Sequence, residues 1–600
     1  MRRINIISQS ANSKLYWFVL SVIFICNSGY ADVGTKHKLP PLSLKPVTQG
    51  QSHFAVNQVG YYKSRVKIGY LVNPTSDAKI YLYRLSDNTV EHLDKLKVIT
   101  STLKGVQQIV EIDFSQHRKP GWYFLTDGTI RSPRFNISDA PFNNVMIMML
   151  RSYYLQRCGY DINDPMTGLA HAACHVSEET IVRPLNMQTD HLEHSSSRFS
   201  GGWHDAGDFG RYVATATVSV SRILAAFGDN HARMRNIDLA VPEKNLLGDV
   251  LAEVNYELEW LLKMQSDTGL LYRKVAGKKW PSLMPPDGDI QPLFVYGHST
   301  DDTAKFVATM ALASRVYRFE DPDKSRKYLQ AALKSWAYLE NNPNFVLDWE
   351  KSDDSGSGPY KSNNTDTEAS LTLDSDDRMW ALSELAVTTG EDKYWRKLIQ
   401  RNPSPINIFE WKDPSAMGRW HAIRTNCFSI FTSLCERWKI QITHRAQVAY
   451  RISKQQSFRV ANNRYIWGSN KMAAEEGIFL AQAYLLNNKR EYLEAAIHQL
   501  DYIFGANPFS QSFVTGAGER PVRHVSHIYG RGAKVHIPGL LVGGANSLAQ
   551  AGVAPKNMGQ LSYIDSEKSY AVNEYAIDYN ASLIGLISLI DRAVTRSQVR

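Results

Sequence analysis

Hydrophobic residues follow two different periods along this chain, and the change lies near Pro141. Between Phe54 and Ile137 they fall into short alternating or β-branched runs separated by turn-forming stretches. These runs are KIGYLV (67–72), AKIYLYRL (78–85), QQIVEIDF (107–114) and GWYFLTDG (121–128). Short strands of this kind predict a small β-sandwich of the immunoglobulin type over residues 50–140.

After residue 141 the hydrophobic residues recur at the spacing of an α-helix. The segments with this pattern are NNVMIMMLRSYYLQRCGY (143–160), LLGDVLAEVNYELEWLLKMQ (246–265), DDTAKFVATMALASRVYRF (301–319), SRKYLQAALKSWAYLE (325–340), RMWALSELAVTTG (378–390), MAAEEGIFLAQAYLLN (472–487), REYLEAAIHQLDYIFG (490–505) and YNASLIGLISLIDRAV (579–594). The stretches between them are long and hold most of the Gly, Pro, Asp and His residues. This arrangement predicts a mainly α domain over residues 141–597, an α/α barrel of helical hairpins with a cleft built by the loops at one rim.

The N-terminus predicts a cleaved signal peptide over residues 1–31. Positive residues precede an apolar run from Leu15 to Cys26, and the small residues Gly29 and Ala31 fit a signal-peptidase site. The run is too short to span a bilayer comfortably, and no later stretch is long and apolar enough for a transmembrane helix. We therefore expect a soluble exported protein, secreted or periplasmic.

Composition and net charge indicate which kinds of molecule this protein can bind. The chain is 43% hydrophobic and 11% aromatic, as in a folded globular protein with aromatic faces for core packing and for stacking on sugars. Its net charge of +9 falls to +6 without the three cations Arg2, Arg3 and Lys14, and the other basic residues are scattered rather than gathered in a stripe. We expect a monomer that binds no nucleic acid.

The strongest chemical signal is GGWHDAGDFGRYV (201–213). Its two aspartates, Asp205 and Asp208, lie three residues apart among glycines that allow tight turns. Two carboxylates can hold one water as acceptors, which suits a general base, and Trp203 offers a stacking face for a sugar. For an isolated D-x-x-D pair, the alternative is a polar turn that caps the next helix.

A candidate proton donor lies in SYAVNEYAIDYNASLIG (569–585). Glu574 has apolar and aromatic neighbours, among them Tyr570 and Tyr575, where a helix begins. Desolvation raises the pKa of a carboxyl, so Glu574 can stay protonated near neutral pH and serve as a general acid. A glutamate favoured by the helix dipole in a first turn is the alternative for this stretch alone.

Together these stretches resemble glycoside hydrolase family 9, the inverting (α/α)6-barrel cellulases, over nearly the whole mature chain. FAVNQVGY (54–61) is similar to the opening of the immunoglobulin-like domain that precedes the barrel in one branch, and GGWHDAGDFGRYV to the loop that holds the catalytic base. Further matches in the same order are WLLKMQ (260–265), DDRMWALSELAVTTGEDKYW (376–395), FGANPFSQSFVTGAG (504–518) and NEYAIDYNASLIG (573–585).

The resemblance implies a role for each carboxyl group. Asp208 would deprotonate the attacking water, Asp205 would help to hold that water, and Glu574 would protonate the leaving glycosidic oxygen. A water between base and sugar requires carboxyl groups roughly 6.5–9.5 Å apart, which is the inverting geometry.

The residues expected to bind the substrate differ from the family pattern. The family usually has a His-His-Arg run after the VTG segment, whereas this chain has ERPVRHVSHIYG (519–530). Arg523, His524 and His527 offer similar groups in another order, and we expect them to bind substrate together with Trp203 and Tyr570.

Two metal sites are candidates. Cys158, Cys174, His175 and His204 supply two thiolates and two imidazoles, the ligand set of a closed structural zinc site, and they match the zinc ligands of the branch with the immunoglobulin-like domain. The other two cysteines of the mature chain are Cys427 and Cys435, and one pair among the four can alternatively form a disulfide.

Calcium is the second candidate. Asp249 and Glu253 lie where relatives often bind Ca²⁺, but Lys244 and Asn245 replace the usual Ser-Gly before them. A solvated helix start is therefore the favoured interpretation of this stretch.

The sequence thus predicts an exported, inverting endo-β-1,4-glucanase that acts on cellulose or related β-glucans. One alternative is an exo-β-glucosaminidase on chitosan oligosaccharides, which would need an acidic group for the 2-amino nitrogen and a blocked cleft end. The other is a non-catalytic carbohydrate-binding protein, which would have no need for a matched acid and base.

Overall fold

The computed structural model describes residues 40–43, 47, 50–75, 78–176, 180–182, 191–193, 199–243, 246–348, 373–401, 405–425 and 431–598. The predicted signal peptide, Lys244, Asn245 and Cys427 lie outside these ranges. Within the described residues, no helix has the length and apolar character that a membrane span requires.

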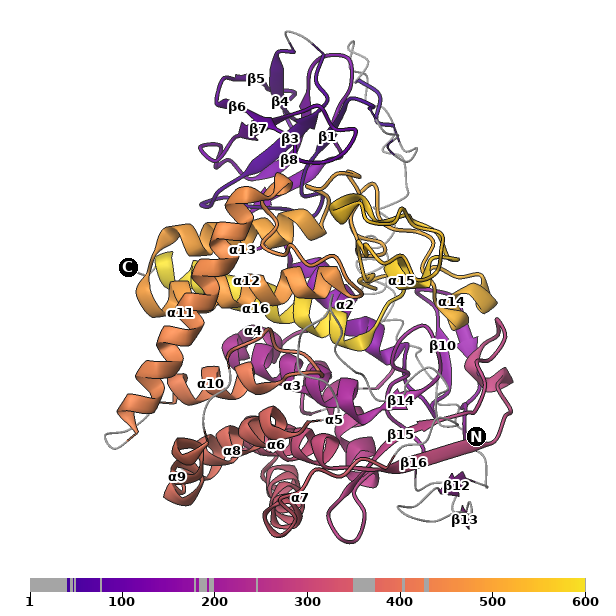
Figure 1. Cartoon of the computed structure of the whole chain (residues 1–600). Coiled ribbons are helices and arrows are strands. Elements are labelled where there is room, and N and C mark those ends of the chain that lie inside the picture. Colours follow the sequence, from indigo (N-terminus) through magenta and orange to yellow (C-terminus); the bar gives the residue numbers. More distant parts are fainter. Residues whose placement is uncertain are drawn as a thin grey trace, which may run out of the picture.

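The N-terminal domain is a sandwich of two β-sheets, drawn in indigo and violet in Figure 1. One sheet has the strand order β1-β3-β7-β6 and the other β2-β9-β8-β4-β5. The strands are β1 (His53–Ala55), β2 (Gly60–Tyr62), β3 (Ile68–Val72), β4 (Ile80–Arg84), β5 (Val90–Leu93), β6 (Leu96–Thr100), β7 (Gln108–Asp113), β8 (Gly121–Thr126) and β9 (Phe135–Ser138).

Strand β3 shows why this domain docks on the rest of the chain. Leu71 packs in the sandwich core, while its neighbours Tyr70 and Val72 point to the opposite face and join the core of the helical domain. A strand that is covered on both faces has few polar residues at any position, and β3, with the sequence IGYLV, has none. Strand β3 is therefore buried between the second sheet and the helices, whereas the edge strand β6 is mostly exposed.

The helical domain is a barrel of two concentric layers. The inner helices are buried on nearly every face and are α3 (Val213–Asp229), α6 (Thr300–Tyr317), α8 (Ser375–Thr389), α10 (Ser415–Arg424), α12 (Ser469–Asn487) and α16 (Ile577–Gln598). Each packs against a more exposed outer helix, in the same order α5 (Asp249–Lys263), α7 (Pro322–Asn341), α9 (Asp392–Gln400), α11 (Thr432–Gln455), α13 (Arg490–Ile503) and α2 (Asn143–Tyr154). This is the predicted (α/α)6 barrel, and the predicted fold class is confirmed.

The remaining described helices are short. They are α4 (His231–Met234), α14 (Ile528–Ala533), α15 (Tyr570–Asn573), and the 3-10 turns η1 (Pro286–Gly288), η3 (Ser457–Arg459) and η4 (Gly559–Leu561). Helices α14 and α15 lie in the long segments that approach the barrel rim (Figure 1).

The periodicity of the sequence did not reveal several elements of the barrel. Helices α3, α9, α10 and α11 were absent from the predicted set. The start of α3, VATATVSVS, alternates apolar and polar residues as a strand does, while the buried positions of α11 recur at helical spacing among many charged and polar residues. A sheet of order β13-β12-β16-β15-β14 was also missed. Its strands, with a separate β10–β11 hairpin, are β10 (Ile162–Asp164), β11 (Leu169–His171), β12 (Thr180–Val182), β13 (His191–Glu193), β14 (Arg211–Tyr212), β15 (Leu271–Ala276) and β16 (Leu293–Ser299).

The sandwich holds a rim segment of the barrel through backbone contacts. The Gln58 backbone N–H donates to the Phe504 carbonyl (3.0 Å), and its side-chain oxygen accepts from the Arg520 N–H (2.8 Å). The Glu519 carboxylate accepts from the Arg134 N–H at 2.8 Å. These contacts fix residues 504–520, and the chain then continues into the rim.

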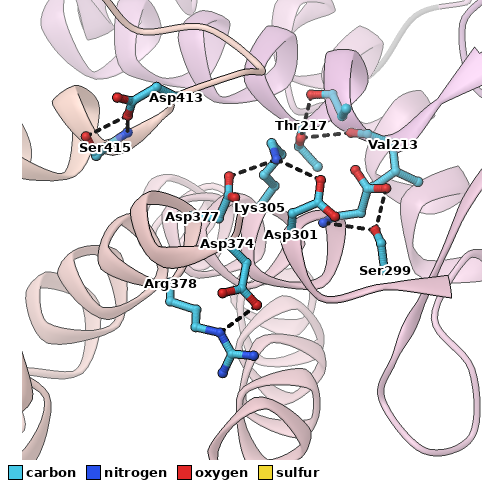
Figure 2. A network of polar contacts seen from close by, with 12 residues as sticks. Val213, Thr217, Ser299, Asp301, Lys305, Asp374, Asp377, Arg378, Asp413 and Ser415 are labelled. Atoms are coloured by element: carbon cyan, nitrogen blue, oxygen red, sulfur yellow. Dashed lines mark hydrogen bonds and ion pairs between the residues drawn. The ribbon is translucent and has the colours of Figure 1, made fainter. Parts of the chain in front are cut away.

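A buried ion network joins two inner helices (Figure 2). The Lys305 ammonium on α6 lies 2.8 Å from the Asp377 carboxylate on α8 and 3.4 Å from that of Asp301. All three side chains are at most 2% exposed. Burial alone would lower the pKa of Lys305, but the carboxylates of Asp377 and Asp301 outweigh it and raise that pKa. Lys305 is therefore charged and neutralises this part of the core.

We predict that Lys305→Met lowers the free energy of unfolding by about 3–5 kcal/mol, because it leaves buried carboxylates without their cation. The matched control is Lys327→Met, which removes a pair with Glu259 (2.6 Å) whose side chains are 53% and 33% exposed. An exposed pair contributes about 0–1 kcal/mol. Urea unfolding of both variants measures the difference, and equal losses would show that the Lys305 network does not stabilise the barrel.

Candidate active site

A cavity of about 850 Å³ lies at the end of the barrel where inner helices begin. Lining residues directly precede or start α3, α6, α10, α12 and α16. The positive ends of these helix dipoles therefore point toward the cavity and favour negative charge there. The lining side chains that the argument uses are Asp205, Asp208, Tyr212, Thr215, Arg273, Trp280, Pro281, Leu283, Asp301, Asp302, Trp411, Trp467, His527, Arg531, Tyr570 and Glu574.

Asp208 is held at the cavity by two donors. The Tyr212 hydroxyl donates to Asp208 Oδ2 at 2.7 Å, and the Gly210 N–H donates to the same oxygen at 3.2 Å. The side chain is 7% exposed and lines the cavity. Within the described residues, Oδ1 accepts from no protein group, so it is the oxygen left for a ligand.

Asp205 is fixed by its backbone. Its N–H donates to the Gly210 carbonyl (2.9 Å), and its carbonyl accepts from the Ile577 N–H (2.8 Å) at the start of α16. Its Oδ1 is buried without a hydrogen-bond partner among the described residues. Burial, and then the nearby Asp208 carboxylate, raise the pKa of Asp205 well above its usual range. A water shared with Asp208 would give this oxygen a partner.

Glu574 lies directly against the aspartate loop. A Cβ added at Gly207 would come within 2.9 Å of Glu574 Oε1 and 2.5 Å of the Ser526 carbonyl oxygen. Glycine at 207 is therefore what lets the two segments approach, and the Ile528 N–H to Gly207 carbonyl bond (2.8 Å) closes the contact. The structure thus brings together Asp205, Asp208 and Glu574, which are distant in sequence.

The environment of Glu574 favours the neutral form of its carboxyl. Burial is the largest cause, followed by the carboxylates of Asp208 and Asp205, and together they raise the pKa of Glu574 well above its usual range. The raised pKa favours the protonated form of this carboxyl. A protonated carboxyl beside an aspartate with one unengaged oxygen is a matched acid and base.

Aromatic side chains form the walls of the cavity. Tyr570 is 44% exposed, and its ring lies 5.7 Å from that of Trp467. Trp280 and Trp411 line other parts of the wall. Flat apolar faces with polar groups between them suit the stacking of sugar rings. Tyr570 is thus at the cavity, as predicted for a substrate-binding residue.

His527 also reaches the cavity, but its ring is engaged within the protein. Its Nδ1 accepts from the Gly530 N–H (3.1 Å), and its Nε2 faces the side-chain amide of Gln156 (2.9 Å). Burial, and then His204, lower the pKa of His527 to about 3. His527 is therefore neutral and serves to hold this rim segment as well as to line the cavity.

Trp203 does not have the role that the sequence suggested. The side chain is 1% exposed, its ring packs 4.6 Å from that of Tyr153, and its indole N–H donates to Glu253 (2.8 Å). Trp203 is absent from the cavity lining. The prediction that it stacks on a sugar is wrong, because the side chain is packed in the core and hydrogen-bonded there.

Arg523 and His524 are likewise absent from the cavity lining. Both side chains are exposed, neither is part of the lining, and both backbone N–H groups donate to the Asp565 carboxylate (3.1 and 2.9 Å). The structure therefore does not place their side chains among the groups that line the cavity with Asp208 and Glu574. Arg531, later in the same segment, does line the cavity.

Two further acids at the cavity escaped the sequence analysis. Asp301 and Asp302 open helix α6, are 1% and 3% exposed, and each has an Oδ1 atom without a hydrogen-bond partner among the described residues. Burial, followed by Asp301, raises the pKa of Asp302 to about 7. The adjacent acids in STDDTAKF were the available signal, but they resemble the ordinary acidic first turn of a helix.

The four predicted zinc ligands meet beside the aspartate loop. Their donor atoms all lie within 4.8 Å of one another. The separations are 4.0 Å between the Sγ atoms of Cys158 and Cys174, 3.5 Å from Cys158 Sγ to His175 Nδ1, and 3.7 Å from Cys174 Sγ to His204 Nε2. The two thiols are not joined by a disulfide.

These separations fit a tetrahedral zinc ion. Zn–S bonds of about 2.3 Å and Zn–N bonds of about 2.0 Å give tetrahedral edges of roughly 3.3–3.8 Å. Four protein ligands leave no open position, so the metal would be structural. His204 is next to Asp205, and its ring lies 5.2 Å from that of Phe209, which follows Asp208. The cluster therefore supports the loop that carries both aspartates.

The calcium candidate has a different explanation. Glu253 is 4% exposed and pairs with the buried Arg157 guanidinium (2.8 Å), and Asp249 accepts from the Leu239 N–H (2.8 Å). This stretch is neither a solvated helix start, as the sequence favoured, nor a set of carboxylates free for an ion. Glu253 instead anchors Arg157 and Trp203, which flank the zinc ligands.

Comparison with known proteins agrees with this geometry. The family model described as glycosyl hydrolase family 9 matches residues 142–587, and that described as the cellulase N-terminal ig-like domain matches residues 49–132. Endoglucanase D of Acetivibrio thermocellus is 25% identical over 96% of this chain and 86% of its own length. A xyloglucan-specific endo-β-1,4-glucanase of Bacteroides ovatus is 28% identical over 89% of this chain and 93% of its own.

Solved structures show the same fold. A metagenome-derived glycoside hydrolase family 9 endoglucanase superposes with a TM-score of 0.81 at 33% identity, covering 90% of this chain and 99% of that one. A Zn-binding triple mutant of another family 9 endoglucanase superposes with a TM-score of 0.80 at 28% identity, covering 88% and 99%.

We predict that the purified chain contains about one zinc ion and that Cys174→Ser loses it. Because the cluster supports the aspartate loop, the variant should show lower thermal stability and lower activity together. Elemental analysis and thermal unfolding measure this, with Cys174→Ser compared with wild type before and after chelation. If the wild type contains no zinc and Cys174→Ser is as stable as the wild type, these four residues are ordinary core side chains.

Proposed function

Because the chain belongs to glycosyl hydrolase family 9 and is a glycoside hydrolase of the cellulase type, we propose that it cleaves β-1,4-glucosidic bonds of a β-glucan with inversion. The observation that carries this proposal is the pairing at one cavity of Glu574, whose pKa is raised, with Asp208, whose Oδ1 accepts from no protein group among the described residues. The names of the relatives, endoglucanases and a cellodextrinase, support a β-glucan as the substrate.

We assign the base to Asp208. Tyr212 and Gly210 hold Oδ2, so the carboxylate cannot rotate freely, and Oδ1 faces the ligand space. A water bound to Oδ1 loses one proton to the carboxylate as its oxygen attacks the anomeric carbon. Asp205 accepts the second hydrogen bond of that water and orients it.

We assign the acid to Glu574. Its proton passes to the glycosidic oxygen as the bond to the anomeric carbon breaks, so the leaving sugar departs as a neutral alcohol. After one turnover Asp208 carries a proton and Glu574 is ionised, and exchange with solvent resets both. Such paired proton transfers typically contribute a factor of about 10²–10⁴ each to the rate.

Three further features belong to this proposal. Zinc is the metal that the Cys₂His₂ cluster suits best, in a structural role. Export is supported by Cys435, which is disulfide-bonded, since disulfides persist mainly in oxidising compartments. The monomeric state stays a prediction.

The stereochemical outcome tests the assignment of base and acid. If a water between Asp208 and the sugar attacks, the first product released from a β-linkage is the α-anomer. Proton NMR of a fresh digest of cello-oligosaccharides records this before mutarotation. Asp208→Asn serves as the inactive control, and a β-anomer as first product would mean that a carboxylate attacks the sugar directly.

A second candidate function is favoured by Asp301 and Asp302. Each presents a buried carboxylate oxygen without a partner among the described residues, and both line the cavity. Such oxygens would suit the 2-ammonium group of a glucosamine unit. This supports the exo-β-glucosaminidase alternative. The Arg273 cation on the same lining opposes it, because a second positive charge nearby would repel an ammonium group.

The effect of the substitution Asp302→Asn distinguishes an endoglucanase from an exo-β-glucosaminidase. A charge-assisted hydrogen bond is worth about 1.5–3 kcal/mol, so a glucosaminidase should lose roughly tenfold or more in kcat/KM on glucosamine tetramer and much less on cellotetraose. An endoglucanase should cleave cellotetraose in the wild type and leave the glucosamine tetramer intact. Cleavage of only the glucosamine tetramer by the wild type would replace the glucanase proposal.

A further inference from the structure

The connection between β15 and β16, residues 277–292, forms one wall of the cavity. Trp280, Pro281 and Leu283 lie on this connection and line the cavity. Trp280 is 55% exposed and therefore presents a ring face to a ligand. The position of this wall depends on what anchors the connection.

Two carboxylates of the connection reach the segment that carries zinc ligands. Asp287 Oδ2 accepts from the Ala172 N–H at 3.1 Å, and Asp289 Oδ2 lies 3.5 Å from His175 Nε2. The side chains of His175 and Asp289 are 3% and 9% exposed, so water does not screen this pair. The pair joins the cavity wall to the metal cluster.

The geometry of His175 explains the role of Asp289. His175 Nδ1 faces Cys158 Sγ at 3.5 Å, inside the cluster, while Nε2 points outward to Asp289. A ring that binds a metal through Nδ1 carries its proton on Nε2. A carboxylate that accepts this proton fixes the ring orientation and increases the basicity of the ligand nitrogen.

The rest of the connection is held so closely that a shift of Asp289 would move the residues around Trp280. The Gln291 amide donates to Asp289 Oδ1 (3.0 Å) and to the Lys279 carbonyl (2.9 Å), next to Trp280. On the other side, a Cβ added at Gly532 would come within 2.5 Å of the Met284 nitrogen. Displacement of Asp289 would therefore displace the wall.

We propose that Asp289, assisted by Asp287, is a positioning residue that couples the metal cluster to the cavity wall. A zinc ion held by the cluster would order His175; His175 holds Asp289, and Asp289 holds the connection that carries Trp280. Substrate binding at the Trp280 wall then depends on the metal, although the metal touches no substrate. The consequence for substrate rests on the proposed function, whereas the coupling of metal and wall does not.

The first test measures the metal and the wall without any substrate. Asp289→Ala should weaken zinc binding by about 10–100-fold in chelator competition, and Asp289→Asn, which keeps an acceptor, should recover much of the loss. Because Lys278 and Lys279 precede Trp280, tryptic cleavage there should accelerate in Asp289→Ala and in chelated wild type. Asp267→Asn, an exposed acid just before β15, is the control and should change neither quantity.

The second test uses a substrate that the wild type cleaves. Asp289→Ala should raise KM several-fold with a smaller change in kcat, as Trp280→Ala should, and the double variant should be no worse than the larger single effect. Unchanged zinc affinity in Asp289→Ala, or tryptic cleavage that does not respond to zinc, would overturn the coupling. Absence of activity on β-glucans would overturn the proposed function and leave the first test intact.

Discussion

Carboxyl groups buried at the convergent ends of the inner helices are the constraint on which this structure depends. Asp208 is 7% exposed, and Asp205 and Glu574 are partly buried at the same cavity. Charges so placed repel one another, and the least costly arrangement keeps some of them protonated. The helix N-termini favour the charge that remains. An acid and a base therefore coexist at one cavity because the fold makes simultaneous ionisation unfavourable.

The surrounding structure holds this arrangement together. The aspartate loop is tied by hydrogen bonds to α16 through Ile577 and to the rim through Ile528, and the Cys₂His₂ cluster supports its other side. The β-sandwich fixes the rim segment that begins at Phe504. Each support lies outside the cavity, so substitutions far from the carboxyls should alter their alignment. Through the contact between Asp289 and His175, the Cys₂His₂ cluster also supports the cavity wall that carries Trp280.

The sequence predicted the parts of the site that short motifs and burial determine. Asp205, Asp208 and Glu574 meet as expected, because glycines at the aspartate loop and apolar neighbours of Glu574 are local signals. The four metal ligands meet for the same reason, since each lies beside a turn or at a helix end. The α/α barrel and the β-sandwich followed from the two periods of hydrophobic residues.

The orientation of individual side chains could not be predicted in this way. Trp203 is two residues from Asp205 but points into the core, which depends on the path of the loop. Arg523 and His524 were chosen by order in a motif, whereas their side chains are exposed and absent from the cavity lining. Strands β15 and β16 are buried along their whole length and show no alternation. Such features depend on contacts between segments distant in sequence.

The protonation state of Glu574 at neutral pH tests the central claim most directly. Infrared difference spectra between wild type and Glu574→Gln isolate the carbonyl stretch of this one protonated carboxyl, without any assumption about substrate. A pKa raised by burial and by Asp208 predicts a protonated band at pH 7 that disappears only as the pH rises further. A carboxylate that is already ionised at pH 7 and gains its proton near pH 4.3, the ordinary value for glutamate, would contradict the account.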